Sequence, residues 1–439
     1  MLNKIIPEIQ YLRALAVITV LLFHLDKEIF RGGFIGVDIF FVISGFLMIK
    51  ILREKKYSVV NFYIKRFKRI FPVLLFVCIL TVLIGSKILF LHEFNSLIKD
   101  NIAALTFTSN IFFWLKLKSY FSDTTIIPLL HTWSLSLEIQ FYLIIPFIIL
   151  ILNKLSLKSQ VFFLFSIILL SLVLCALFLG RDQSFYLIPF RINEFFLGTI
   201  LYLIPKKNFY KRINGDFVFI IYNSLIIFLL FNYENINFPG VHGFLICLFT
   251  ILFLYFNNYR LVKNLINFNV VQFIGKISYS LFLIHLPVLV FYKIYLVHEV
   301  EFLQKIFLLF FIFILSAFTY YFVENKFYQK KINLFYNSVL AITMLSFFLL
   351  TKYSQNLIDI NQDKKKNVEY QKFIDTVNAD NPYELGIQPQ VNDINFKKGK
   401  KNILIFGDSH ANDVFLALNN QKENSHNFIY LGINSDCFE

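Results

Sequence analysis

Long apolar runs recur along this 439-residue chain, and they constrain its fold more than any other feature. A run of about 20 apolar residues can cross the hydrocarbon core of a bilayer as an α-helix. Hydrophobic residues make up 57% of the chain and charged residues only 16%, so an ordinary soluble core is excluded. The runs predict an all-α polytopic membrane protein whose spans are 8–26, 33–52, 70–91, 131–151, 159–180, 184–204, 217–233, 241–257, 270–294, 303–323 and 333–351.

The cations between these runs predict the orientation of the chain. With the N-terminus in the cytoplasm, most Lys and Arg residues fall in cytoplasmic loops, which is the charge bias that sets membrane topology. The net charge of +14 is therefore assigned to topology, and no nucleic-acid partner is expected. The odd number of spans places the C-terminal region outside the cytoplasm. The polar-interrupted stretch 99–115 is expected to be a re-entrant or interfacial helix in an outside loop.

Three ionisable residues interrupt the apolar runs RALAVITVLLFH and FIGVDIFFVISG of the first two spans, where each costs about 2.5 kcal/mol or more at the bilayer centre. Arg13 and His24 are eleven residues apart, which returns them almost to the same helix face, about 16 Å apart along the axis. Asp38 lies near the outer end of the second span. A His24–Asp38 pair at the outer side of the membrane is the starting hypothesis for a reaction centre.

Other spans carry ionisable residues at a similar predicted depth. Glu138 and His285 lie in the outer halves of their spans, and Arg191 and Glu194 form an i, i+3 pair on one helix face. A structural role is the alternative for each of them. It is the favoured interpretation for the Arg191–Glu194 pair, and His131 near the interface is expected to be solvated. The agreement in depth between separate spans favours a functional site.

The tail changes composition. Residues 353–400 are polar and predict a linker. The segment KKNILIFGDSHAND then predicts a buried strand at 403–406, a tight Gly-Asp-Ser turn and a helix, which is the opening unit of an α/β domain. Because only about 30 residues follow, this domain is expected to be truncated. The four cysteines are scattered with no metal-ligand spacing, so no metal site is expected.

Several of these segments together resemble the acyltransferase-3 family of membrane O-acyltransferases, in its form with a C-terminal SGNH-hydrolase-like domain. Arg13 and His24 reproduce the Arg-x10-His pattern of the family's first span. The other segments that resemble family motifs are GFIGVDIFFVISGF (33–46), KRFKRIFP (65–72), HTWSLSLEIQFYLIIP (131–146), GKISYSLFLIHLP (275–287) and YYFVENKF (320–327). The segment ILIFGDSHAND resembles the first block of an SGNH domain, with Ser409 at the nucleophile position.

The resemblance implies a division of the chain. Residues 1–332 would form the acyltransferase domain with ten family spans, 333–352 an eleventh, linking helix, 353–400 an extracytoplasmic linker, and 401–439 the start of the SGNH-like domain. The implied location is the bacterial inner membrane, with a cytoplasmic N-terminus and a periplasmic or extracellular C-terminal region. The lipid bilayer is an obligatory partner.

The resemblance also implies transfer of an acyl group, usually acetyl, from cytoplasmic acyl-CoA to a hydroxyl of a cell-surface glycan. His24 is then the expected general base and Asp38 its orienting acid, with Glu138 and His285 as further candidates for proton handling. The expected donor site holds CoA through Arg13, Lys65, Arg66 and Arg69. Ser409 is the expected covalent nucleophile of the C-terminal domain, although the Asp-x-x-His block that supplies its base is absent.

Two other function classes stay open on the sequence alone. In a transporter or flippase the intramembrane charges would line a substrate path. In a non-catalytic anchor the membrane domain would only hold the C-terminal domain, and the basic cluster 65–69 would only mark the cytoplasmic side. For the acyltransferase, the acceptor stays open between O-antigen, capsule and peptidoglycan.

Overall fold

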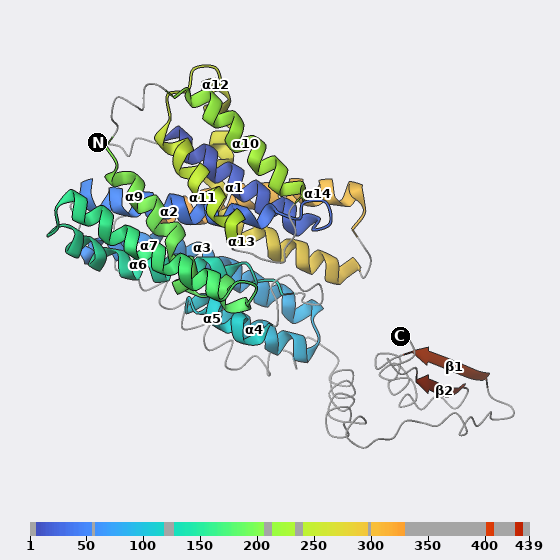
Figure 1. Cartoon of the computed structure of the whole chain (residues 1–439). Coiled ribbons are helices and arrows are strands. Elements are labelled where there is room, and N and C mark those ends of the chain that lie inside the picture. The colour runs from blue at the N-terminus through green and yellow to red at the C-terminus, as the bar shows by residue number, and fades with distance from the viewer. Residues whose placement is uncertain are drawn as a thin grey trace. The chain divides into compact units, whose positions relative to one another are not determined.

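The computed structural model divides the chain into two compact units, Met1–Lys352 and Tyr353–Glu439. The residues that it describes are 6–54, 58–117, 127–205, 213–232, 240–296, 300–329, 401–407 and 426–432. In the first unit these residues form a bundle of helices (Figure 1). Its helices are α1 Pro7–Leu25, α2 Gly36–Glu54, α3 Val59–Ile88, α4 Leu91–Leu105, α5 Ser109–Lys116, α6 Thr132–Leu152, α7 Leu157–Leu177, α8 Asp182–Tyr186, α9 Ile188–Leu203, α10 Gly215–Asn232, α11 Gly240–Tyr255, α12 Lys263–Ile266, α13 Asn269–Leu296, α14 Phe302–Thr319 and α15 Asn325–Gln329.

The structure confirms an all-α polytopic membrane fold for this unit. Among the described residues, eight helices are long and apolar enough to cross a membrane. The two remaining predicted spans within the described ranges, 184–204 and 241–257, coincide with the shorter helices α9 and α11. The eleventh predicted span, 333–351, lies outside the described residues. The interrupted stretch 99–115 falls on the C-terminal half of α4 and on α5.

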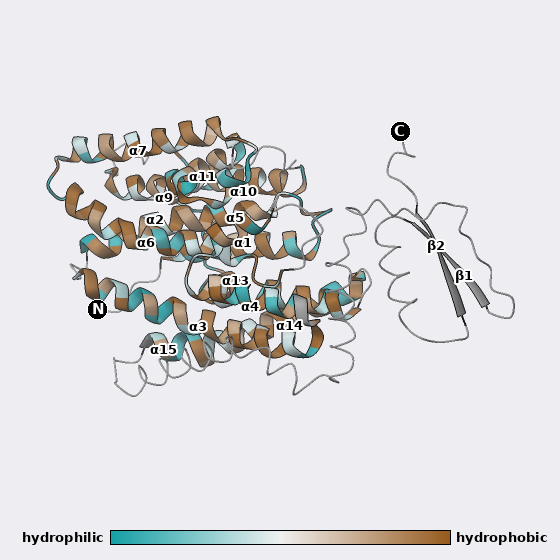
Figure 2. Cartoon of the chain, turned by 90° about the horizontal axis from the view of Figure 1, so that it is seen from below, coloured by the Kyte–Doolittle hydropathy of each residue, from teal (hydrophilic) through white to brown (hydrophobic). Residues whose placement is uncertain are grey.

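Four helices form the centre of the bundle. Helix α1 packs along α13 and also contacts α2, and α2 packs along α9. These central helices are mostly buried, whereas α7 and α14 direct large apolar side chains outward, including Phe162, Leu170, Phe307 and Phe310. In Figure 2 the ribbons of the helices are coloured mostly brown, because most of their residues are hydrophobic. Exposed apolar side chains on the outer helices are what a lipid solvent requires, since water would penalise them.

Helix α3 begins eleven residues before the predicted span 70–91, at Val59. Ser58 caps its start, because its Oγ accepts a hydrogen bond from the backbone N–H of Asn61 at 3.3 Å. The basic cluster 65–69 therefore lies within a helix rather than in a loop. Lys and Arg are good helix formers, so a span can extend through them into the interfacial region.

Glycines set the distance between the central helices. A Cβ at Gly45 of α2 would lie 1.8 Å from the carbonyl oxygen of Phe195 in α9. A Cβ at Gly198 of α9 would lie 2.0 Å from the carbonyl oxygen of Val42 in α2. Gly275 of α13 meets the backbone of α1 in the same way, at Gln10. These reciprocal contacts let the backbones approach closely, as small residues do between membrane helices.

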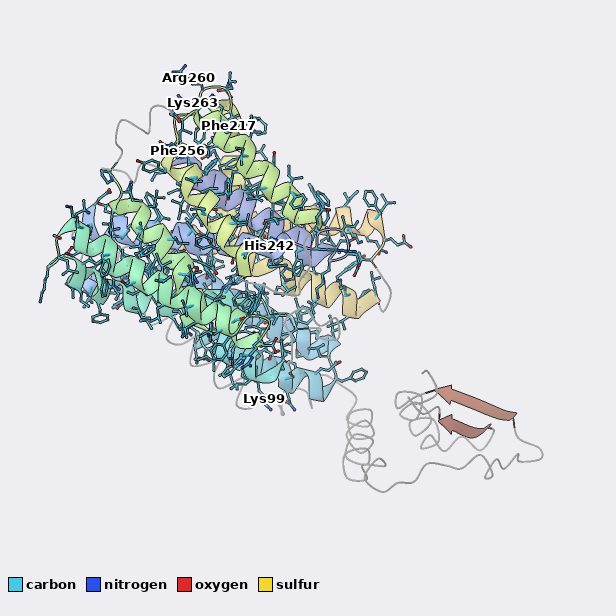
Figure 3. The ribbon with its side chains drawn as sticks, viewed as in Figure 1. Lys99, Phe217, His242, Phe256, Arg260 and Lys263 are labelled. Atoms are coloured by element: carbon cyan, nitrogen blue, oxygen red, sulfur yellow. The ribbon has the colours of Figure 1, made fainter. Side chains whose placement is uncertain are left out.

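Two local features lie at the ends of helices. Between α14 and α15 the chain forms a π-helical turn, Tyr320–Glu324, and Glu324 accepts a hydrogen bond from Ser280 Oγ of α13 at 2.7 Å. In the first turn of α10, the carboxylate of Asp216 accepts hydrogen bonds from the backbone N–H groups of 260–262. Figure 3 shows the result: Arg260 and Lys263 lie together beside the start of α10, and Lys99 lies on the other side of the bundle.

The second unit contributes two described strands, β1 Lys401–Gly407 and β2 His426–Gly432. They pair in parallel, with Lys401 opposite His426 and Gly407 opposite Gly432. Strand β1 includes the strand predicted at 403–406. Parallel neighbours need a crossover connection, which is the pattern of an α/β unit. Residues 408–425, which contain Ser409, lie outside the described residues.

Candidate active site

Three histidines from separate segments meet inside the helical unit. His24 lies in the last turn of α1, His285 lies within α13, and His131 directly precedes α6. The ring centroids of His24 and His285 are 5.1 Å apart, and those of His131 and His285 are 5.2 Å apart. All three side chains are buried. The structure therefore brings two predicted site residues together and adds His131, which the sequence analysis expected to be solvated.

Carbonyl acceptors assign the tautomers of two of these rings. His24 Nδ1 lies 2.9 Å from the carbonyl oxygen of Val20, and His285 Nδ1 lies 2.6 Å from that of Phe282. A carbonyl oxygen can only accept, so each Nδ1 carries the hydrogen of a neutral ring. His285 Nε2, 3.3 Å from His24 Nδ1, is then an acceptor. The basic lone pair of His24 is consequently on Nε2.

A buried charge cluster lies beside the histidines. Arg191 of α9 donates a hydrogen bond to Asp38 Oδ1, and Arg191 Nε lies 3.0 Å from Glu194 Oε1. The side chain of Arg191 is fully buried. Its guanidinium carbon also lies 5.7 Å from the centroid of the Phe41 ring and 5.9 Å from that of Trp133. The two carboxylates and the aromatic faces together replace the water that this cation has lost.

The predicted His24–Asp38 pair is wrong, because Asp38 pairs with Arg191. Two physical reasons account for the difference. A guanidinium is permanently charged and holds a buried carboxylate better than a neutral imidazole does. The Nδ1–H of His24 is also directed to the carbonyl of Val20 in its own helix. The i, i+3 pair of Arg191 and Glu194 exists as predicted, with Asp38 as a third member that no spacing rule indicated.

A cavity beside the histidines is lined by three residues that were predicted to bind the donor, Arg13, Arg66 and Arg69. We call it the arginine cavity; its lining is Arg13, Val37, Phe40, Phe41, Ile43, Ser44, Leu47, Met48, Arg66, Arg69, Ile70, Ser134, Leu135, Glu138, Tyr142, Ser278, Tyr279 and Phe282. Glu138 Oε1 accepts hydrogen bonds from Ser44 Oγ and Tyr142 OH there. Three guanidinium groups against one carboxylate give the lining an excess of positive charge, which suits a polyanionic ligand.

A second, smaller cavity is lined by two of the three histidines, His24 and His131. We call it the histidine cavity; its lining is Val20, His24, Phe34, Val37, His131, Trp133, Ser134, Phe185, Arg191 and Phe282. Val37, Ser134 and Phe282 line both cavities, so the two adjoin. Helix α1 passes both of them, with Arg13 at the arginine cavity and His24 at the histidine cavity. Their eleven-residue separation corresponds to about 16 Å along the axis.

Among the described residues predicted for the site, His24 is the one that lines the histidine cavity; His285 and Asp38 contact lining residues of it without being part of the lining. Glu138 lines the arginine cavity instead. Lys65 is exposed and is not part of either lining, because it is one residue, or about 100°, away from Arg66 around the helix. Ser409 lies outside the described residues. Within the described part of the chain, no group of His, Cys, Asp and Glu side chains has a geometry suited to a metal ion.

Two residues of the histidine cavity were not predicted as site residues. His131 stands at the start of the HTWSL segment that the sequence analysis singled out, so a signal for it existed. Arg191 had only its spacing to Glu194. Neither its contact with Asp38 nor its place in the cavity lining follows from the sequence, because both depend on which helix α9 packs against.

Comparison with known proteins identifies the family of the helical unit. Residues 6–322 match a family described as "Acyltransferase domain". The chain is 31% identical over 377 residues to O-acetyltransferase OatA of Staphylococcus aureus strain MRSA252, a match that covers 78% of this chain and 62% of that relative. It is 33% identical over 318 residues to OatA of strain NCTC 8325 / PS 47, covering 67% of this chain and 52% of the relative.

These matches span only part of the relatives' length, and no solved structure matches the chain. The family match nevertheless covers most of the chain and includes every residue that lines the two cavities. The segments quoted from the sequence lie in the same region. The chain therefore belongs to the acyltransferase-3 family.

Proposed function

We propose that this protein is a membrane O-acetyltransferase that moves an acetyl group from acetyl-CoA to a hydroxyl of a cell-surface glycan. One observation carries the proposal: a cavity with three arginines adjoins a cavity with a basic histidine nitrogen, through the shared residues Val37, Ser134 and Phe282. An anionic donor held in the first cavity can present its reactive end to a base in the second. The names of the relatives support O-acetyl transfer as the reaction.

In this proposal the arginine cavity holds the donor. Coenzyme A ends in phosphates, and Arg66 and Arg69 are one helical turn apart on α3, so both can face them. Arg66 Nε is buried and meets no hydrogen-bond partner among the described residues, which leaves a donor for a ligand. Arg13 stands on α1, below His24, where it can contact the donor between its phosphates and its thioester.

The acyl transfer follows from the tautomer of His24. The acceptor hydroxyl oxygen attacks the carbonyl carbon of the thioester and forms the new ester bond, while His24 Nε2 takes the hydroxyl proton. The C–S bond then breaks. The proton passes from His24 to the departing thiolate, and CoA leaves as a thiol. His285 holds the His24 ring through its Nε2, and Glu138 tunes the charge of the donor cavity rather than the base.

The rest of the arrangement in the cell is part of the same proposal. The N-terminus is cytoplasmic, the C-terminal region is outside, and the membrane is the bacterial plasma membrane. The basic cluster at the start of α3 then faces the compartment that supplies acyl-CoA. O-antigen, capsule and peptidoglycan are the candidate acceptors. A covalent relay through Ser409 rests on the family resemblance alone.

The test uses permeabilised cells that express the full chain and receive radiolabelled acetyl-CoA. Base-labile label on the purified envelope glycan measures transfer. We expect His24→Ala to reduce it about 100-fold or more, since a lost general base costs that much. His242→Ala is the matched control, because His242 is an exposed histidine on α11 (Figure 3) and should leave transfer unchanged. Equal labelling in both variants would contradict the proposal, and a transporter would label no glycan from acetyl-CoA at all.

A further inference from the structure

We propose that Phe282 sets the length of the acyl group that the enzyme transfers. This inference rests on the proposed acyl transfer and goes beyond it to the selection of the donor. Phe282 is one of three residues that line both cavities, and it is the largest of the three. The thioester carbon must pass this shared wall to come within reach of an acceptor at His24. Its substituent therefore lies against Phe282.

The ring of Phe282 is held from three sides. Its centroid lies 5.2 Å from that of His131 in an edge-to-face contact, 5.7 Å from that of His285 and 6.1 Å from that of Phe40. These partners come from α2, α13 and the residue before α6. Edge-to-face contacts at this spacing are favourable and define the orientation of the ring. Phe282 is thus a fixed limit to the space rather than a side chain that yields to a longer substituent.

The histidine cavity has room for a small group only. Its volume is about 10 Å³, against about 80 Å³ for the arginine cavity. A water-sized group needs about 10–15 Å³ on this measure. The methyl of an acetyl group is of that size, whereas a butyryl chain adds two methylenes. Removing the Phe282 ring would open this cavity towards the larger one.

The alternative position for a longer acyl chain is in the arginine cavity, folded back along the donor. That position would place methylenes beside the guanidinium groups and the Glu138 carboxylate, which is unfavourable for an apolar chain. Leu47 of α2 lines the arginine cavity and not the histidine cavity, and it is not among the three residues whose rings surround Phe282. It therefore distinguishes the two positions in an experiment.

The experiment measures selectivity between donors. Permeabilised cells expressing the full chain receive acetyl-, butyryl- or hexanoyl-CoA, and mass spectrometry quantifies the carboxylic acids that base releases from the envelope glycan. We expect Phe282→Ala to raise the butyryl-to-acetyl ratio about tenfold or more, the scale that a methylene contributes in an apolar pocket. Phe282→Leu should raise it less, and Leu47→Ala should change the total rate but not the ratio.

The outcomes distinguish the role of Phe282 from the proposed acetyl transfer. An unchanged ratio in the Phe282 variants, or an equal rise with Leu47→Ala, overturns the role of Phe282 and leaves acetyl transfer intact. Absence of transfer from any acyl-CoA by the wild-type chain overturns the proposed function instead. If Phe282→Ala does not accumulate in the membrane, Phe282→Leu decides alone, and a wild-type ratio in that variant overturns the inference.

Discussion

At the scale of single residues, the buried cluster pairs one cation, Arg191, with two carboxylates, Asp38 and Glu194. The charge of Arg191 balances carboxylates on α2 and on its own helix, and none of the three side chains is accessible to water. Removing the cation leaves buried carboxylates without compensation, and breaking such a pair typically costs about 3–5 kcal/mol. Because Asp38 lies on α2 and Arg191 on α9, the cluster helps to hold these two helices in place beside the histidine cavity.

A double-mutant cycle tests that coupling. We expect Arg191→Met to lower the thermal unfolding temperature of the detergent-solubilised protein strongly, and Asp38→Asn to lower it less. The double variant should lose less than the sum of the two, because each single change removes the partner of the other. Losses that add would show that Arg191 and Asp38 act independently. Lys305→Met, which removes a cation elsewhere in the bundle, serves as the control partner for Asp38→Asn and should add.

At the scale of secondary-structure elements, the glycine contacts between α2 and α9 decide how close the two helices come. We expect Gly198→Ala to be destabilising by about 1–3 kcal/mol, since its Cβ would meet the backbone of Val42 and the helices must move apart. Acyl transfer should fall as well, because Arg191 and Phe41 shift with the helices. Thermal unfolding and glycan labelling measure the two effects.

Gly240→Ala is the matched control for this substitution. At the start of α11, its Cβ would meet Leu179 Cδ1 at an ordinary 3.5 Å, with no closer atom among the described residues. Alanine is the better helix former by about 1 kcal/mol, so this variant should be neutral or slightly more stable. A loss of stability in both variants would mean that glycine flexibility, and not the approach of α2 to α9, is what matters.

The spans were predictable, and the contacts between them were not. Hydrophobic length alone located α1, α2, α6 and α13, because a bilayer imposes one length on every crossing helix. It does not give the start of α3, which lies eleven residues before the predicted span, because a helix can continue through cations beyond the hydrocarbon core. The relative position of Arg13 and His24 could be predicted because both residues lie in one helix, α1. Asp38 was assigned to His24 because neighbours along the chain are not always neighbours in the bundle.

At the scale of the whole molecule, an ion pair joins the C-terminal end of α1 to α14. Lys305 Nζ of α14 lies 2.5 Å from Asp26 Oδ2, directly after α1. Burial alone would raise the pKa of Asp26, but the Lys305 ammonium and the backbone N–H of Ile29 lower it below its usual value. Asp26 lies beyond the last residue of α1, so this carboxylate titrates outside the span.

The pH dependence of stability follows from the sign of that shift. A carboxylate whose pKa is lowered by folding stabilises the folded state above its unfolded pKa of about 4, and that contribution is lost as the pH falls through the lowered value. We expect Asp26→Asn to lower the thermal unfolding temperature at pH 7, corresponding to at most about 1 kcal/mol. The difference from wild type should shrink and vanish as the pH falls through the lowered pKa of Asp26. Glu28→Gln, which removes a wider and more exposed ion pair, should have no such effect.

The π-helical turn Tyr320–Glu324 has a consequence for insertions and deletions. A π-turn holds one residue more than an α-turn, so the helices on its two sides keep their faces while the chain is longer by one. Deleting the exposed Phe322 would let the turn become α-helical with α14 and α15 still in place. Deleting Phe310 in mid-helix would instead rotate everything after it by about 100° and carry Glu324 away from Ser280. In this segment, the chain between α14 and α15 can therefore lose one residue while both helices keep their contacts.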